Sequence, residues 1–158
     1  MNVGEMMTRD VQTCSPSEPL NRAAQLMWDH DCGCLPVVDG EGRTIGMITD
    51  RDICMAAYTQ GQPLANMSVA SAASHNAITV AENARIDDAE ALMQKHQIRR
   101  IPVVDGGGKP VGIVSMNDLA RRANGGHHRH NGLSADTIVK TMAAICQPAA
   151  TTQAHAAE

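Results

Sequence analysis

The sequence predicts an α/β fold made of two β-α-β-β-α repeats related by a pseudo-twofold axis, with a C-terminal helix after them. The first observation is a duplication: Pro36-Val37-Val38-Asp39-Gly40 recurs 66 residues later as Pro102-Val103-Val104-Asp105-Gly106. The second is that the offset stays at 66 along both copies, without insertion or deletion between residues 35 and 57. One unit of this size has too small a core to stand alone, whereas two can bury their sheets together. Other pairs at this offset are Thr13 and Thr79, Ala23 and Ala89, His30 and His96, Gly46 and Gly112, and Asp52 and Asp118.

The elements of each copy follow from hydrophobic spacing and turn residues. A short extended stretch comes first, and a helix with an apolar face follows it. Two buried strands come next, joined by a turn rich in Asp and Gly, and a second helix begins directly after the second strand. The apolar helix faces are Leu20, Ala23, Ala24 and Met27 in the first copy, and Ile86, Ala89 and Met93 in the second. The expected strands are 11–13, 35–38 and 44–48, then 77–80, 101–104 and 110–114, with second helices starting at Thr49 and Ser115.

The chain divides into four parts. Ser134 is a good helix cap, and the apolar residues after it recur at helical spacing, which predicts a tail helix that ends before Pro148. The parts are residues 1–62 (first repeat), 63–124 (second repeat), 125–133 (polar linker) and 134–158 (tail helix and disordered end).

Composition and charge argue against several classes of function. Aromatic residues make up 1% of the chain, with one Trp, one Tyr and no Phe, so base stacking on nucleic acid is not expected. The formal net charge of -4 lacks the basic surface of a DNA or RNA binder. No apolar run of about 18 residues is present to span a membrane, and the N-terminus has no secretion-signal pattern. We therefore expect a cytoplasmic protein whose five cysteines lie in a reducing compartment.

The motif Thr49-x-x-Asp52 recurs as Ser115-x-x-Asp118, and each copy follows a strand and opens a helix. One interpretation is a capping box, in which the hydroxyl binds a backbone N–H and the acid reaches back, without any ligand. The other adds a ligand, because a helix N-terminus attracts phosphate and a carboxylate accepts ribose hydroxyls. Gly46 and Gly112 would let that ligand approach the backbone. The two interpretations are compatible.

These segments resemble the CBS repeat. The resemblance rests on Leu35-Pro36-Val37-Val38-Asp39, on Gly46-Met47-Ile48-Thr49-Asp50-Arg51-Asp52 and on their second copies, and covers about residues 3–123. It implies a stand-alone pair that forms a homodimer and binds AMP, ADP, ATP or S-adenosylmethionine in the cleft between the repeats. It places Asp52 and Asp118 at the ribose, Thr49 and Ser115 at ribose or phosphate, and Thr13, Thr79, Val37 and Val103 around the adenine.

The two copies differ where a phosphate would lie. Arg99-Arg100 in the second copy aligns with Gly33-Cys34 in the first. A guanidinium near the cleft would hold phosphate through two hydrogen bonds, so Arg99 and Arg100 are candidate phosphate ligands. The alternative is an arginine pair that faces solvent or an interface. The difference predicts one good site and one weak or empty site.

Histidines and cysteines form a rival set of candidates. His30, Asp31, Cys32, Cys34 and His96 are candidates for a metal or redox site, and His30 and His96 could meet across the pseudo-twofold axis. A single C-x-C is a weak signal, and histidines that interact with the dipole at a helix C-terminus explain His30 and His96 equally well, so we do not expect a zinc site.

Two further features lie in or near the tail. The family resemblance raises a disulfide between Cys14 and Cys146 that would tie the tail to the body. A histidine-rich run, His127-His128-Arg129-His130, is flanked by glycine in the linker and is therefore a poor preorganised metal site.

Three classes of function can be compared. A ligand-sensing, signal-transducing module is favoured, and it would regulate a target protein in trans. Catalysis is not expected, because no nucleophile–base pair, P-loop or dinucleotide glycine motif is present. The alternative is a ligand-free interaction or stress-response protein, with or without a metal or redox site built from His and Cys.

Overall fold

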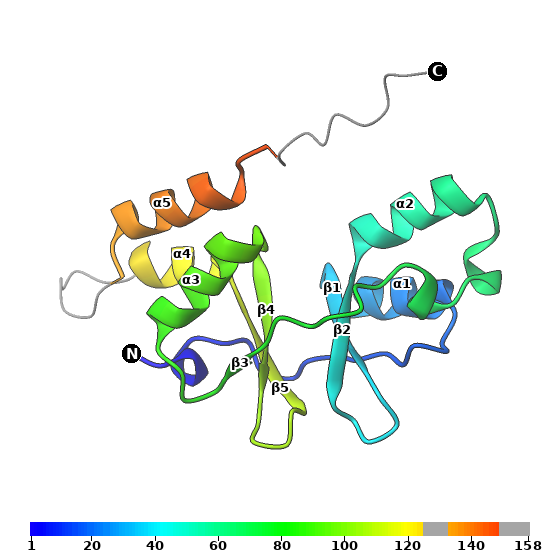
Figure 1. Ribbon diagram of the computed structural model, residues 1–158, viewed down its shortest axis with the longest axis horizontal. Helices are drawn as coiled ribbons and strands as arrows, with labels where there is room; N and C mark the ends of the chain where they lie inside the picture. Colours follow the sequence, from blue (N-terminus) through cyan, green and yellow to red (C-terminus); the bar gives the residue numbers. More distant parts are fainter. Residues whose placement is uncertain (125–132, 149–158) are drawn as a thin grey trace.

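A computed structural model describes residues 1–124 and 133–148 of the chain (Figure 1). The expected linker lies outside the described residues except for its last residue, Leu133, and the histidine run within it lies outside them too. The chain end from 149 onward also lies outside the described residues. The helices are α1 (Leu20–Asp29), α2 (Asp50–Gln60), α3 (Ile86–His96), α4 (Met116–Asn124) and α5 (Ala135–Ile145). The strands are β1 (Cys34–Val38), β2 (Thr44–Thr49), β3 (Val80–Ala81), β4 (Arg100–Val104) and β5 (Pro110–Ser115). Short 3-10 turns are η1 (Val3–Glu5), η2 (Leu64–Asn66) and η3 (Val69–Ser71).

The duplication is preserved in strand register. β1 and β2 pair antiparallel with Cys34 opposite Thr49, and β4 and β5 pair with Arg100 opposite Ser115, at the same offset of 66. In the second repeat β3 adds a parallel strand to β4, so that three strands form one sheet. The predicted α/β fold of two related repeats and a C-terminal helix is confirmed.

The first extended stretch of the first repeat is shorter than expected. It makes a single parallel bridge, between Cys14 and Val37, in place of a strand. The next amide along the chain, that of Ser15, donates a 2.6 Å hydrogen bond to the Glu18 carboxylate instead of extending a ladder. A side chain that captures a backbone donor in this way competes with sheet formation.

The apolar helix faces lie where their spacing predicts. α1 buries Leu20, Ala23 and Met27, and α3 buries Ile86, Ala89, Glu90 and Met93. Only Glu90 in this set is charged, and its partner lies on the tail helix. α1 begins at Leu20 with Pro19 as its N-cap, a position that proline tolerates because no helical N–H is required there.

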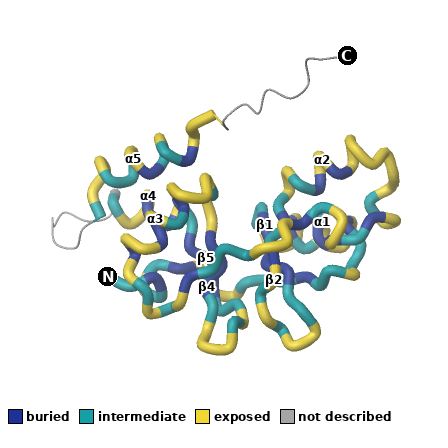
Figure 2. Tube along the Cα trace, viewed as in Figure 1, coloured by how far each residue is buried: buried dark blue, intermediate teal, exposed yellow. Residues whose placement is uncertain are grey.

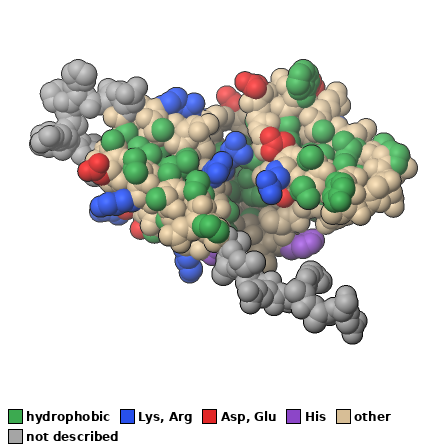
Figure 3. Space-filling view, turned by 90° about the horizontal axis from the view of Figure 1, so that it is seen from above, with side chains coloured by type: hydrophobic (Ala, Val, Ile, Leu, Met, Phe, Trp, Pro, Cys, Tyr) green, Lys and Arg blue, Asp and Glu red, His purple; other side chains and the backbone are tan. Residues whose placement is uncertain are grey.

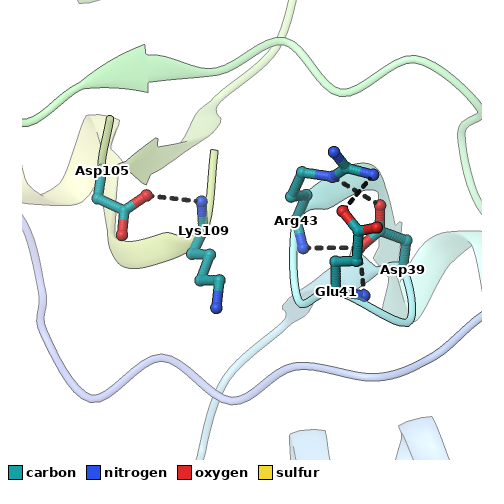
Figure 4. Close-up of polar contacts among 5 residues, drawn as sticks. All are labelled: Asp39, Glu41, Arg43, Asp105 and Lys109. Carbon is teal, nitrogen blue, oxygen red and sulfur yellow. Dashed lines mark hydrogen bonds and ion pairs between the residues drawn. The ribbon is translucent and has the colours of Figure 1, made fainter. Parts of the chain in front are cut away.

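An Asp residue organises the turn of each β-hairpin (Figure 4). Asp39 Oδ1 accepts hydrogen bonds of 2.9 Å from the backbone amides of Glu41 and Arg43. Asp105 Oδ1 accepts the equivalent bonds from Gly107 and Lys109, at 2.8 and 2.9 Å. These amides favour the ionised carboxylates, and they lower the pKa of both Asp39 and Asp105.

The hairpin tips of the two repeats meet. The amide of Thr44 donates a 2.9 Å hydrogen bond to the carbonyl of Gly108. The symmetric bond does not form, because the residue equivalent to Thr44 is Pro110, which has no N–H. Gly42 and Gly108 have φ of 81° and 79°, a region that favours glycine, so these turns depend on both glycines.

The repeats exchange their leading segments. Val3 and Met7 pack in the core of the second repeat, whereas Met67, Val69 and Ala73 pack in the core of the first. In Figure 1 the start of the chain accordingly lies beside β3 and β5, away from α1. Figure 2 shows two buried regions, one in each half of the molecule. Each core is therefore completed by residues that belong, by sequence, to the other copy.

The tail helix covers the second repeat. α5 packs against α3 and α4, with Ile145 and Thr141 buried. Ser134 caps α5 by accepting a 3.2 Å bond from the amide of Thr137, as predicted. The apolar stripe that the sequence predicts, Ile138, Met142 and Ile145, faces the core of the second repeat. None of the helices described here has both the length and the apolar character needed to cross a membrane.

Candidate functional site

The junction between β2 and α2 carries the first candidate pair. Thr49 is the N-cap of α2, and its hydroxyl oxygen accepts a 3.2 Å bond from the amide of Asp52. The Asp52 carboxylate reaches back through Oδ2 to the amide of Thr49 at 2.9 Å and to its hydroxyl at 2.7 Å. The capping interpretation is therefore confirmed for this motif. Among the described residues, no donor engages Oδ1 of Asp52, and the residue is half-buried.

The junction between β5 and α4 repeats this arrangement and adds to it. Ser115 donates to Asp118 Oδ2 through its amide, at 2.8 Å, and through its hydroxyl, at 2.5 Å. The other carboxylate oxygen, Oδ1, accepts a 3.3 Å hydrogen bond from the hydroxyl of Thr8 and forms an ion pair with Arg121. The side chain of Asp118 is 5% exposed. The two equivalent aspartates thus differ: Asp118 is engaged through both oxygens and buried, while Asp52 is engaged through one.

The glycines before these junctions serve the packing of the chain itself. A Cβ at Gly46 would overlap the carbonyl oxygen of Ser74. A Cβ at Gly112 would lie 3.0 Å from the carbonyl oxygen of Thr8 and closer still to the side chain of Met7. The expectation that these glycines admit a ligand to the backbone is wrong, because the exchanged leading segments already occupy that space.

The two candidate arginines point to different places. Arg99 lies beside the tail, where its Nη2 is 3.7 Å from Sγ of Cys146. Arg100 reaches across to the first repeat. A Cβ placed on Gly33 would lie 3.4 Å from Nη2 of Arg100 and 3.2 Å from Oδ2 of Asp50, so the guanidinium and the carboxylate both lie beside Gly33. Arg100 is therefore the arginine that lies near the start of α2.

Figure 3 views the molecule from above, and some of its Lys and Arg side chains lie on either side of a furrow between the two halves. In Figure 1, β2 and β4 lie on the inner sides of the two halves; Thr49 ends β2 and caps α2, which carries Asp52, and Arg100 begins β4. Thr13 and Thr79 are half-buried, one residue before the Cys14 bridge and one before β3. Val37 and Val103 belong to the two cores and are 3% and 0% exposed, so adenine contact would fall to their backbones.

The cysteines and histidines do not assemble. All five cysteines are free thiols. Burial raises the pKa of Cys14 to about 12, and burial also raises that of Cys34 to about 11 against the opposing effect of Arg100. His30 caps the C-terminus of α1 and His96 ends α3, both exposed, as helix-end histidines. Within the described ranges, no three His, Cys, Asp or Glu side chains are placed to hold a metal ion.

The Cys14–Cys146 disulfide does not form in this structure. Cys14 is buried in the core of the first repeat, 2% exposed. Cys146 is the exposed C-cap of α5, on the second repeat, beside Arg99. The tail is held on the second repeat by its apolar stripe, which places its end against the wrong repeat for a bond to Cys14.

A groove between α1 and α2 is not evident from the sequence. It has a volume of about 390 Å³. Trp28, which lines it, is 86% exposed, and Tyr58, further along α2, is 83% exposed. The signal that could have indicated this surface is that both aromatic residues of the chain lie on helices of the first repeat. The groove is lined by Ala24, Met27, Trp28, Asp31, Cys32, Asp50, Ile53 and Cys54.

Two repeats with equivalent strand-to-helix junctions, which exchange their leading segments, define a tandem CBS pair. The CBS domain family matches residues 3–58 and 69–125, which is more than half of the chain. The chain therefore belongs to the CBS domain family. It is 40% identical over 119 residues to CBS domain-containing protein YhcV of Bacillus subtilis, covering 75% of this chain and 83% of that protein. It is 34% identical over 146 residues to Hypoxic response protein 1 of Mycobacterium tuberculosis, covering 92% of this chain and 94% of that protein.

Solved structures of similar fold include ligand complexes. The CBS domain pair of protein MJ0100, in complex with 5′-methylthioadenosine and S-adenosyl-L-methionine, is 28% identical with a TM-score of 0.72 and covers 79% of this chain and 97% of that one. CBSX2 in complex with AMP is 26% identical with a TM-score of 0.67, covering 78% and 96%. Hypoxic Response Protein I with two coordinated zinc ions is 34% identical with a TM-score of 0.69, covering 77% and 98%.

Proposed function

We propose that this chain is a non-catalytic regulatory module that binds an adenosine-containing ligand between its repeats, at the junction of β2 and α2. The observation that carries the proposal is the Asp52 carboxylate. It stands in the first turn of α2, fixed through Oδ2 by Thr49, with Oδ1 free of donors from the described residues. A carboxylate held in this way can accept ribose hydroxyls, the role that acidic residues have in dinucleotide sites.

The surroundings of Asp52 suit the rest of such a ligand. The N-terminus of α2 carries a partial positive charge, which favours phosphate or carboxylate groups. Arg100 brings a guanidinium to the same end of α2 from the other repeat. AMP, ADP and ATP would engage both features through phosphate, and S-adenosylmethionine through its carboxylate. The complexes of the MJ0100 pair and of CBSX2 support the choice of ligand class.

Binding at this place would report on the arrangement of the repeats. Asp52 belongs to the first repeat and Arg100 to the second, so a ligand that contacts both favours the arrangement in which they are close. A ligand shifts a conformational equilibrium only through such a difference in affinity between states. The regulated target would be a separate protein that contacts the module in trans.

Calorimetry on nucleotide-stripped protein tests the ligand class. We expect AMP, ATP or S-adenosylmethionine to bind with micromolar affinity, about −8 kcal/mol. Asp52→Ala should abolish binding, whereas Asp29→Ala, a change of an exposed acid at the end of α1, should leave it intact. Absence of heat and of any thermal shift with all three ligands would reject the proposal.

A second candidate function is that of a ligand-free interaction protein. The burial of Asp118 and the filling of the space at Gly46 and Gly112 favour it, since these features remove cleft volume. The bare apolar surface on α1 and α2 would then be the functional surface. This candidate requires that the calorimetric experiment shows no ligand binding while the protein still self-associates.

A further inference from the structure

The two junctions of the pair are unequal in a way that the chain itself imposes. Asp52 and Asp118 occupy the same position of their repeats, 66 residues apart, and both are held by a capping hydroxyl. They differ in what reaches the second carboxylate oxygen. At Asp118 that oxygen accepts hydrogen bonds from Thr8 and Arg121, and at Asp52 it accepts none from the described residues.

The difference follows from two substitutions between the copies. Arg121 lies one helical turn after Asp118, where its guanidinium can turn back to the carboxylate. The equivalent residue in the first repeat is Met55, which cannot form an ion pair. A charge-assisted bond of this kind is stronger than a neutral one. Asp52 therefore lacks the ion pair that Asp118 has, because methionine replaces the arginine at the equivalent position.

The second substitution concerns the exchanged leading segments. Thr8 bridges to Ile113 of β5 and directs its hydroxyl to Asp118 at 3.3 Å. Its equivalent, Ser74, bridges to Met47 of β2 but uses its hydroxyl on the backbone, accepting from the amide of Met47 at 3.0 Å. Because the Ser74 hydroxyl is used on the backbone of Met47, it leaves Asp52 unengaged.

We propose that Thr8 and Arg121 form a latch that closes the Asp118 junction, so that the protein binds one adenosine ligand per chain, at Asp52. This inference rests on the proposed function and specifies its site and stoichiometry. A ribose at Asp118 would have to displace Arg121 and Thr8 from a side chain that is 5% exposed. At Asp52 a ribose hydroxyl would meet an oxygen that is already free.

The latch can be opened with two substitutions and copied in part with one. Arg121→Met, combined with Thr8→Ala, gives the second repeat the character of the first and keeps the Ser115–Asp118 capping box. Met55→Arg gives the first repeat the ion-pairing residue of the second, at a position that is 45% exposed and tolerates the longer side chain. Circular dichroism and thermal unfolding establish that each variant is folded.

Isothermal titration of the full chain with AMP, repeated with S-adenosylmethionine, measures the stoichiometry. We expect one ligand per chain in the wild type, two after Thr8→Ala/Arg121→Met, and affinity weakened about tenfold or more by Met55→Arg, as for loss of one strong polar contact. Asp52→Ala should remove the wild-type site but leave the opened Asp118 site of the Thr8→Ala/Arg121→Met variant.

The possible failures are distinct. Two ligands per chain in the wild type overturn the latch while the proposed function survives. One ligand that is lost with Asp118→Ala and kept with Asp52→Ala overturns the latch and also rejects the junction of β2 and α2 as the binding site, and only the ligand class of the proposed function then survives. No binding in the wild type or in any variant overturns the proposed function and the latch together. Binding seen only after Thr8→Ala/Arg121→Met rejects Asp52 as the binding site. Thr8 and Arg121 would then close the Asp118 junction, which would be the one junction able to bind the ligand.

Discussion

Gly46 illustrates how a residue that suggests ligand binding can serve packing instead. The sequence places it before a polar junction, where close backbone approach by a phosphate is a reasonable expectation. In the structure its missing side chain makes room for the carbonyl oxygen of Ser74, which belongs to the segment that leads into the other repeat. The residue therefore joins the repeats, and its substitution should affect the stability of the fold.

Gly46→Ala is expected to destabilise the protein by about 1–3 kcal/mol, the usual cost of overpacking. The new methyl group would force the Ser74 segment away from β2 and break the bridge to Met47. Gly40→Ala is the matched control, because a Cβ at Gly40 meets no atom within 4 Å. Urea unfolding measures both. Equal effects of the two substitutions would contradict the assigned role of Gly46.

At the scale of elements, helices and hairpins were predictable and the exchange of segments was not. The helices α1 and α3 follow from apolar residues at helical spacing, and the hairpins from two apolar runs around an Asp-Gly turn. The offset of 66 identifies Val3 with Val69, but equivalence does not reveal which core each residue enters. Contacts across 110 residues, such as Thr8 to Asp118, leave no local pattern in the sequence.

The docking of α5 on α3 buries an acid, Glu90. Glu90 is 4% exposed, and its Oε1 accepts a 3.4 Å bond from Thr141, which itself accepts a 2.8 Å bond from Gln94. Burial raises the pKa of Glu90 above its usual 4.5, and Asp87 adds to this. Between the usual and the raised pKa the folded state holds a proton that the unfolded state has released. Stability therefore falls as pH rises through that window.

Glu90→Gln should accordingly stabilise the protein at pH 7 and have little effect at pH 4, where Glu90 is mostly protonated in both states. The amide oxygen can still accept the bond from Thr141, so the contact between the helices is retained. We expect an increase in Tm at pH 7 of about 2–5 °C. Thermal unfolding at the two pH values tests this, and an effect of equal size at both would contradict the role of the buried charge.

At the scale of the whole molecule, the two repeats present unequal outer faces. On the second repeat α5 lies across α3 and α4 and covers their apolar surface (Figure 1). The equivalent face of the first repeat, formed by α1 and α2, carries no such helix within the described residues, and it exposes Trp28, Met55 and Tyr58. Several large exposed apolar side chains on one pair of helices make this face a candidate interaction site.

The expected homodimer should therefore form through α1 and α2 of the first repeat, leaving α5 outside the interface. Trp and Tyr are the side chains most often found as energetic anchors of interfaces, each worth about 2 kcal/mol or more. In sedimentation velocity at micromolar concentration, Trp28→Glu and Tyr58→Glu should each shift the sedimentation coefficient from that of a dimer to that of a monomer. Val139→Glu is the control, because Val139 is a 65% exposed apolar residue on α5. A monomeric wild type, or a dimer that only Val139→Glu disrupts, would place the interface elsewhere and leave the groove between α1 and α2 for another partner.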